Sequence, residues 1–127
     1  MSAIYPKAKE QFLLGALNLA SATVSAALIK TTYTYNAADV NVTAALAQQA
    51  GSSVVLSTQS VSADGVFDAA DITFTAVAAG STVNAVLIYS GTTPIAYIDS
   101  GVGFPFATSG ADVTVSFSNS ADKIFRL

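Results

Sequence analysis

Residues 83–99 read VNAVLIYSGTTPIAYID, and this stretch decides the fold class. Residues 83–90 and 95–99 are rich in Val, Ile and Tyr, the β-branched and aromatic residues that pack well in strands. The Gly-Thr-Thr-Pro segment between them carries residues that favour turns. We therefore predict two strands separated by a turn.

The same pattern of short runs bounded by turn signals continues after Gly51. It predicts further strands at 54–61, 72–77, 113–117 and 123–126. Apolar residues alternate with Thr and Ser in two of these runs, so one face is expected to carry Ile72, Phe74 and Ala76, and another Val113, Val115 and Phe117. Regular spacing of alternating strands is typical of a mainly β protein, here an antiparallel β-sandwich or barrel-like domain.

The chain also predicts a short N-terminal helix over residues 6–14. Pro6 suits a first helical turn, because its missing N–H would be unpaired there anyway. The residues that follow are good helix formers, and Gly15 is a natural terminator. We expect Ala8, Phe12 and Leu13 to face inward.

Residues 22–30 predict a buried strand, and the alternating TTYTY of residues 31–35 predicts a half-exposed one. Asn36 and Asp39 resemble a capping pair, so a second short helix is expected from residue 37 toward Gly51. The valines at positions 40 and 42 favour a strand there instead. The alanines and glutamines of residues 44–49 favour the helix.

Residues 12–29 contain no charged side chain, and two lysines precede them, as in a signal peptide or a membrane span. Glu10 in the basic part and Asn18 in the apolar part weaken the signal-peptide interpretation. The membrane span is weakened by four polar residues inside a stretch of minimal length, Asn18, Ser21, Thr23 and Ser25. A helix followed by a strand fits this stretch better, and no membrane contact is expected.

The chain of 127 residues contains no histidine and no cysteine, and only 10% of it is charged. It therefore lacks the commonest general base, the softest nucleophile and the usual ligands of transition metals. We expect one domain spanning residues 1–127 that is not an enzyme and needs no cofactor. A surface this poor in charge is easily desolvated against another protein.

The net charge is −3, and five basic residues are spread along the chain. Nucleic-acid binding requires several Lys or Arg side chains in one groove, so no nucleic-acid partner is expected. Lys30, the one lysine away from the two ends, has no serine-lysine motif beside it, and Glu10 is the sole glutamate. We therefore assign no catalytic residue.

The densest acidic cluster is Asp64, Asp68 and Asp71, in the segment ADGVFDAAD. Carboxylates of this kind could hold calcium, but their spacing does not match an EF-hand loop. Aspartates in turns also bond their own backbone without a metal, and we favour that interpretation. No metal site is assigned.

Aromatic residues offer two further candidates. Tyr33, Tyr35, Tyr89 and Tyr97 could form a platform for sugars or peptides, although packing in the core or at its rim is the commoner use of tyrosine in strands. Phe104, Pro105 and Phe106 follow a glycine-rich segment that lacks the features of a phosphate loop. These three are expected to plug one end of the sandwich rather than form an exposed tip.

Several segments together resemble a known family. They are YPKAKEQFLLGALNL, the strand ending in LIK, TYTYNAAD, DGVFDAADITFTAV, the pair VNAVLIYS and PIAYIDSG, and the ending DVTVSFSNSADKIFRL. In this order they resemble the small virion structural proteins of tailed bacteriophages, over nearly the whole chain.

This resemblance implies a non-enzymatic, β-rich protein of the phage particle, made in the cytoplasm of the bacterial host. The expected role is a capsid decoration or cement protein that contacts the major capsid protein or other virion proteins and self-associates, with a trimer among the arrangements considered. A neck, tail or fibre-attachment component is the first alternative. A carbohydrate- or cell-surface-binding module is the second. The resemblance carries no catalytic or ligand-binding residues over to this chain.

Overall fold

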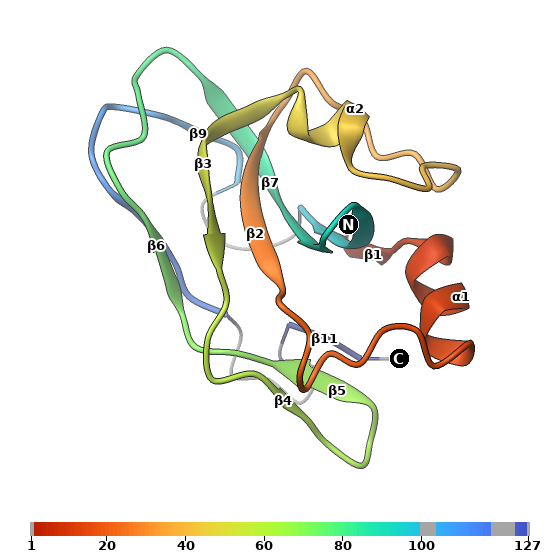
Figure 1. Ribbon diagram of the computed structural model, residues 1–127. Helices are drawn as coiled ribbons and strands as arrows, with labels where there is room; N and C mark the ends of the chain where they lie inside the picture. The colour runs from red at the N-terminus through yellow and green to blue at the C-terminus, as the bar shows by residue number, and fades with distance from the viewer. Residues whose placement is uncertain (1, 100–103, 118–123, 127) are drawn as a thin grey trace.

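The computed structural model describes residues 2–99, 104–117 and 124–126. Among these residues, two short helices and eleven strands form the fold. Their arrangement is shown in Figure 1. In chain order they are β1 (Ser2–Ile4), α1 (Pro6–Leu13), β2 (Ser25–Lys30), α2 (Thr43–Leu46), β3 (Gln49–Val55), β4 (Ser60–Val61), β5 (Val66–Asp68), β6 (Ile72–Phe74), β7 (Thr82–Ser90), β8 (Thr93–Ile98), β9 (Phe106–Ala107), β10 (Val113–Val115) and β11 (Phe125–Arg126). Neither helix of the described chain is long enough to cross a membrane.

The main sheet has the strand order β1-β8-β7-β2-β3, with every pair antiparallel. The predicted strands at 83–90 and 95–99 are β7 and β8, which pair across a turn at Gly91-Thr92. Strand β9 pairs with the first residues of β7. The path of described strands runs from β1 to β3 without closing, so this is a layered sheet rather than a barrel.

Two smaller antiparallel sheets, β10-β6 and β11-β5-β4, lie on one side of the main sheet. The larger apolar cluster fills the space between them, with Leu28 and Ile88 from the main sheet meeting Phe67 and Phe74 from the small sheets. Mainly β character and the antiparallel sandwich are therefore confirmed, because two layers bury their apolar faces against one another.

The opposite face of the main sheet is also buried. Ile29 of β2, Leu87 of β7 and Tyr97 of β8 pack with Val42 and Ala45 from the segment of residues 31–48, which contains α2 and covers this face. Strands covered on both faces read as continuous apolar runs, because neither of their two side-chain rows faces water. This double burial explains the sequence AVLI in β7 and AALI in β2.

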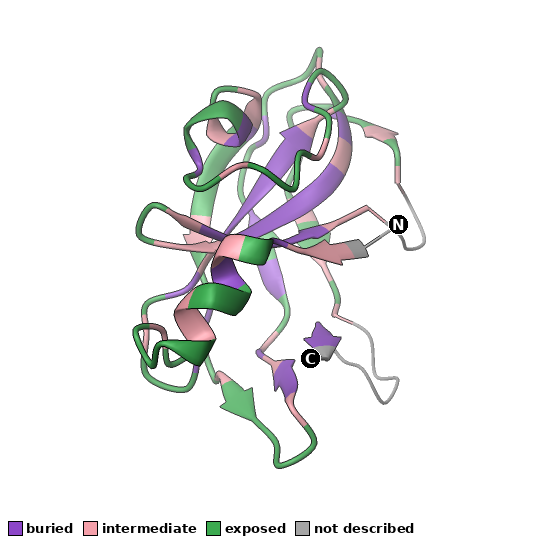
Figure 2. Cartoon of the chain, turned by 90° about the vertical axis from the view of Figure 1, so that its right-hand side faces the viewer, coloured by how far each residue is buried: buried purple, intermediate pink, exposed green. Residues whose placement is uncertain are grey.

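Helix α1 begins at Pro6 as predicted and ends at Leu13. Its inward side carries Ala8, which is fully buried, and Phe12, which is half-buried. Figure 2 shows that buried, half-buried and exposed stretches alternate along this helix. Leu13 was expected to face inward, and this expectation is wrong, because 90% of it is exposed. A step of 100° per residue from the Ala8–Phe12 line turns Leu13 outward.

The segment between β2 and β3 differs most from the prediction. Residues 31–35 form no strand, and helix α2 spans Thr43–Leu46 rather than most of residues 37–50. The helix-favouring residues after it enter β3, where Ala50 is buried opposite Leu28. Strand pairing and burial override helix propensity here.

The remaining strands are shorter than predicted. The run expected at 54–61 divides between β3 and β4, and β6 ends at Phe74. Ala76, expected beside Phe74, adopts a φ of 48°, and the following Val77 is buried in its place. The partly buried Val113, Val115 and Phe117 do share the face that packs on the core. Of the strand expected at 123–126, residues 125–126 form β11, and residue 123 lies outside the described residues.

Leu28 is the most direct test of this core, because it is fully buried in the central strand β2. We expect Leu28→Ala to lower the free energy of unfolding by about 2–5 kcal/mol, since it removes buried methyl groups and leaves a cavity. Urea denaturation would measure the change. Val55→Ala on the exposed edge of β3 is the control and should cost less than about 0.5 kcal/mol. Equal losses for the two variants would contradict the described core.

Candidate functional site

The three aspartates considered as calcium ligands belong to different turns and strands. Asp64 lies in the turn between β4 and β5, Asp68 ends β5, and Asp71 precedes β6. Among the described residues, no group of three or more acidic side chains is arranged to hold a metal ion. Asp71 Oδ1 instead accepts a hydrogen bond from the backbone N–H of Phe117 at 2.9 Å, which joins the residue before β6 to the segment after β10. This contact is a structural one.

The candidate tyrosines gather on the covered face of the main sheet, joined by Tyr5, which the sequence analysis did not consider. The ring centroids lie 4.8 Å apart for Tyr5–Tyr35 and 5.7 Å apart for both Tyr33–Tyr97 and Tyr35–Tyr97. Tyr5, Tyr33 and Tyr97 are buried. These rings pack against one another, as favoured from the sequence, so they do not present a platform to solvent. Tyr89 is partly buried against the same apolar cluster and donates a hydrogen bond to Ser53 Oγ at 2.7 Å.

A chain of hydrogen bonds runs through this tyrosine cluster (Tyr5, Tyr33, Tyr35 and Tyr97). Tyr33 Oη donates to Asp39 Oδ2 at 2.7 Å, and it lies 2.8 Å from Tyr5 Oη. Because the proton of Tyr33 points to the carboxylate, Tyr5 is the donor to Tyr33. Asn36, expected to cap a helix, instead forms a turn in which its Oδ1 accepts from the N–H of Ala38. The network fastens residues 31–48 over the sheet.

Burial changes the acidity of this cluster. It raises the pKa of Tyr5 far above its usual range, and the hydrogen bond to Tyr33 adds to the effect. Burial is also the largest cause of the raised pKa values of Tyr33, Tyr35 and Tyr97. An ionised phenolate would lose its hydration in this apolar setting, so the neutral form is favoured. These hydroxyls are hydrogen-bonding groups of the fold at neutral pH.

Phe104 and Phe106 are half-buried, with ring centroids 5.9 Å apart, and both pack on the larger cluster. Pro105 between them is exposed. The two phenylalanines therefore pack on the core as expected, whereas Pro105 does not. The glycine-rich residues 100–103 lie outside the described residues.

The structure reveals an apolar groove that the sequence analysis did not identify. It has a volume of about 370 Å³ and lies between the end of α1, the following loop, the β4–β5 hairpin and β11. Its lining consists of Phe12, Gly15, Leu17, Asn18, Leu19, Val61, Gly65, Phe67 and Phe125. No charged side chain is among these residues. Asn18 Oδ1 is engaged by the N–H of Ala20 in its own loop. The groove can therefore take up apolar groups.

Exposed apolar side chains lie next to this groove. Leu13 is 90% exposed and Leu14 70%, immediately before Gly15 of the lining, and Val61 of the opposite wall is 51% exposed. Neither leucine lines the groove itself. Single exposed leucines are common, and exposed apolar side chains that gather near a hollow can mark a contact site. We call Leu13 and Leu14 the leucine pair. Helical spacing from Ala8 and Phe12 would have placed both residues outward, and this signal was present in the sequence.

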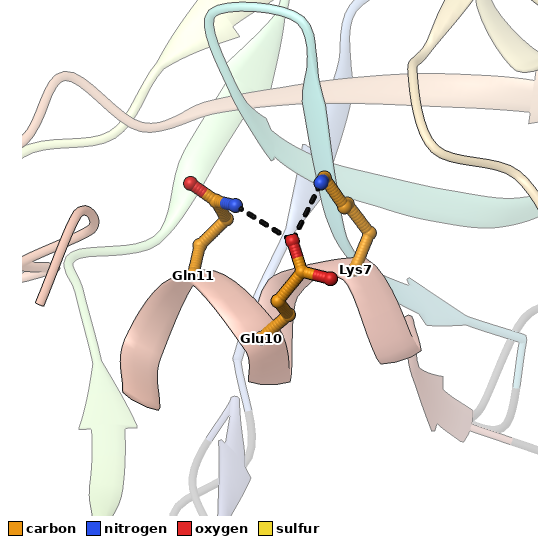
Figure 3. Close-up of polar contacts among 3 residues, drawn as sticks. All are labelled: Lys7, Glu10 and Gln11. Atoms are coloured by element: carbon orange, nitrogen blue, oxygen red, sulfur yellow. Dashed lines mark hydrogen bonds and ion pairs between the residues drawn. The ribbon is translucent and has the colours of Figure 1, made fainter. Parts of the chain in front are cut away.

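Charged residues occupy the solvent side of α1 beside the leucine pair. Lys7 Nζ lies 2.6 Å from Glu10 Oε1, and Gln11 Nε2 donates to the same oxygen at 3.2 Å (Figure 3). The hydrogen bond from Lys7 lowers the pKa of Glu10. Lys9 is exposed. The apolar patch is therefore bordered by polar groups, as contact surfaces between proteins usually are.

No family model matches the chain, and neither curated proteins nor solved structures yield a match.

Tyr33 tests the hydrogen-bond network. We expect Tyr33→Phe to lower the free energy of unfolding by about 1–3 kcal/mol, because the buried hydroxyl of Tyr5 loses its partner. Chemical denaturation measures the change. Tyr89→Phe is the matched control, since it removes a hydroxyl that contacts exposed Ser53, and it should cost less than about 0.5 kcal/mol. If Tyr33→Phe left the free energy of unfolding unchanged, the network would not stabilise the fold.

The raised tyrosine pKa values predict alkaline unfolding. Unfolded tyrosines ionise near a pKa of about 10, and the folded chain resists this ionisation. The stabilisation that these neutral tyrosines contribute is therefore fully present below about pH 10. It is lost as the pH rises toward their pKa values in the folded chain. Urea midpoints measured from about pH 8 to pH 12, with tyrosinate absorbance followed in parallel, check this. The prediction would be contradicted if the urea midpoint stayed constant over this pH range while all tyrosines ionised as they do in the unfolded chain.

Proposed function

We propose that this chain is a structural component of a tailed-phage particle, a capsid decoration or cement protein that stabilises the shell by non-covalent contacts. The observation that carries the proposal is the exposed leucine pair, which directly precedes a lining residue of the apolar groove in the sequence, on a body with little charge. Exposed apolar area of this kind loses free energy when it is buried against another protein. The family resemblance supplies the phage particle as the setting.

The proposed mechanism is passive. The rigid two-layered β body presents a preformed surface, so little conformational entropy is lost when the chain docks on a shell. Each buried square ångström of apolar surface contributes about 25 cal/mol, and a stable contact usually buries about 1,600 Å² in total. Many copies on a symmetric shell would each add such a contact. The proposed partners are the major capsid protein and other virion proteins.

A neck, tail or fibre-attachment component would use the same surface at a different place in the particle. The carbohydrate-binding alternative depends on exposed tyrosines, and the rings of Tyr33 and Tyr97 are engaged with other rings. No observation favours it over the structural role.

The copy number per particle tests this proposal. Purified particles of the phage that encodes the chain should contain it in hundreds of copies by quantitative mass spectrometry, with density on the shell in cryo-electron microscopy. About a dozen copies or fewer, with density on the tail axis, would support the neck or tail alternative instead. Particles that lack the chain would overturn the proposal.

A further inference from the structure

We infer that residues 31–48 form a strap that opens as one unit while the β-sandwich beneath it stays folded. The strap runs from the end of β2 to the start of β3 and covers the face of the main sheet opposite the small sheets (Figure 1). Three properties of the strap support this: its paired ends, its few backbone bonds to the sheet, and a separate core on the other face. The opening belongs to the chain itself, so it does not depend on which protein the leucine pair contacts.

The main sheet holds the two ends of the strap together. Strands β2 and β3 pair with each other, with Ile29 opposite Gln49, and the N–H of Lys30 donates to the carbonyl oxygen of Gln48 at 2.9 Å. Both contacts lie at the base of the strap, where it joins the sheet. Because this base is paired independently, the strap can leave the sheet without separating β2 from β3.

Few backbone hydrogen bonds hold the rest of the strap to the sheet. Among the described residues, the N–H of Thr31 donates to the carbonyl oxygen of Thr82 at 3.0 Å. The N–H of Val42 donates to that of Thr92, also at 3.0 Å. The other strap N–H groups with a described bond donate inside the strap or to Lys30 at its base. Opening therefore breaks little regular structure, and its cost is set mainly by side chains.

The side chains that attach the strap lie close together. Tyr33 contacts Tyr5 through the two hydroxyls and packs its ring on that of Tyr97. Tyr35 packs on the same two rings, and helix α2 adds the buried Ala45. Most other residues of the strap are exposed. Loss of one contact in such a network weakens its neighbours, so we expect the strap to leave as a whole.

The sandwich keeps its own core when the strap opens. No residue of the strap belongs to the larger apolar cluster between the main sheet and the small sheets, which contains Leu28 and Phe74. That packing is therefore the same in the closed and the open form. The closed strap hides the fully buried Ala27, Ile29 and Leu87, and the open strap exposes them as a second apolar surface. The strap is thus a conformational device that withholds or presents this surface.

Hydrogen exchange of the full chain, followed by NMR, tests the opening. Relative to their rates in an unfolded chain, the amides of Val42, Leu46 and Ala47 should share one exchange rate. It should exceed that of the central amides of β2 by at least about tenfold. Tyr33→Phe weakens the closed form alone, so it should accelerate exchange of the strap amides by about tenfold.

Phe74→Leu is the matched control for this measurement. Phe74 lies in the larger cluster, so the substitution weakens the closed and the open form alike relative to the unfolded chain. It should accelerate exchange in β2 by about tenfold and leave the strap amides within about threefold. The inference fails if Phe74→Leu accelerates both sets equally, because the strap would then open only when the whole chain unfolds. It also fails if Tyr33→Phe leaves the strap amides unchanged.

Single thiols give a second test, since the chain contains no cysteine. Ala26 and Ala27 are neighbours on β2, and both are fully buried. Ala27 belongs to the cluster under the strap, whereas Ala26 belongs to the larger cluster. With excess dithiobisnitrobenzoate under native conditions, Ala27→Cys should therefore react at least about tenfold faster than Ala26→Cys. Equal rates in two variants with natural circular-dichroism spectra would overturn the inference.

Discussion

The structure depends on burial of both faces of strands β2 and β7, which lie side by side in the main sheet. Leu28 and Ile88 pack toward the small sheets, whereas Ile29 and Leu87 pack under the segment of residues 31–48. A sheet covered on one face would leave one of these rows in water, and each large side chain in such a row would lose about 1.5–3 kcal/mol of burial. The cover on each face is therefore a requirement of the sequence of these two strands.

The two covers are built by different means. Small antiparallel sheets form the first, and their phenylalanines supply most of the volume. The second has little regular structure, so it is held by side chains: the tyrosine cluster fills the space, and Asp39 ends the hydrogen-bond chain that starts at Tyr5. Buried hydroxyls are costly unless paired, and pairing them within the cluster turns that cost into a specific attachment of residues 31–48.

The composition of the exposed surface follows from the small number of charged residues in the sequence. With few charged residues, the chain covers itself largely with Ala, Ser, Thr and Gly, and the leucine pair stays exposed beside the polar side chains of α1. Apolar area bordered by polar groups favours burial against another protein. The proposed place in a phage particle uses this property.

The sequence by itself determined the antiparallel, mainly β class, helix α1 and the strands β7 and β8, because alternation, proline position and turn residues act over short distances. It also contained the signal that Leu13 points outward, in the spacing from Ala8 and Phe12. Only the tertiary structure decided that residues 49–51 join β3 instead of α2, that Val77 replaces Ala76 in the core, and that Tyr5 meets Tyr33 across 28 positions. These outcomes depend on which strand or ring lies opposite, and local propensity carries no information about a partner distant in the chain. The groove belongs with them, since its walls come from segments near residues 12–19, 61–67 and 125.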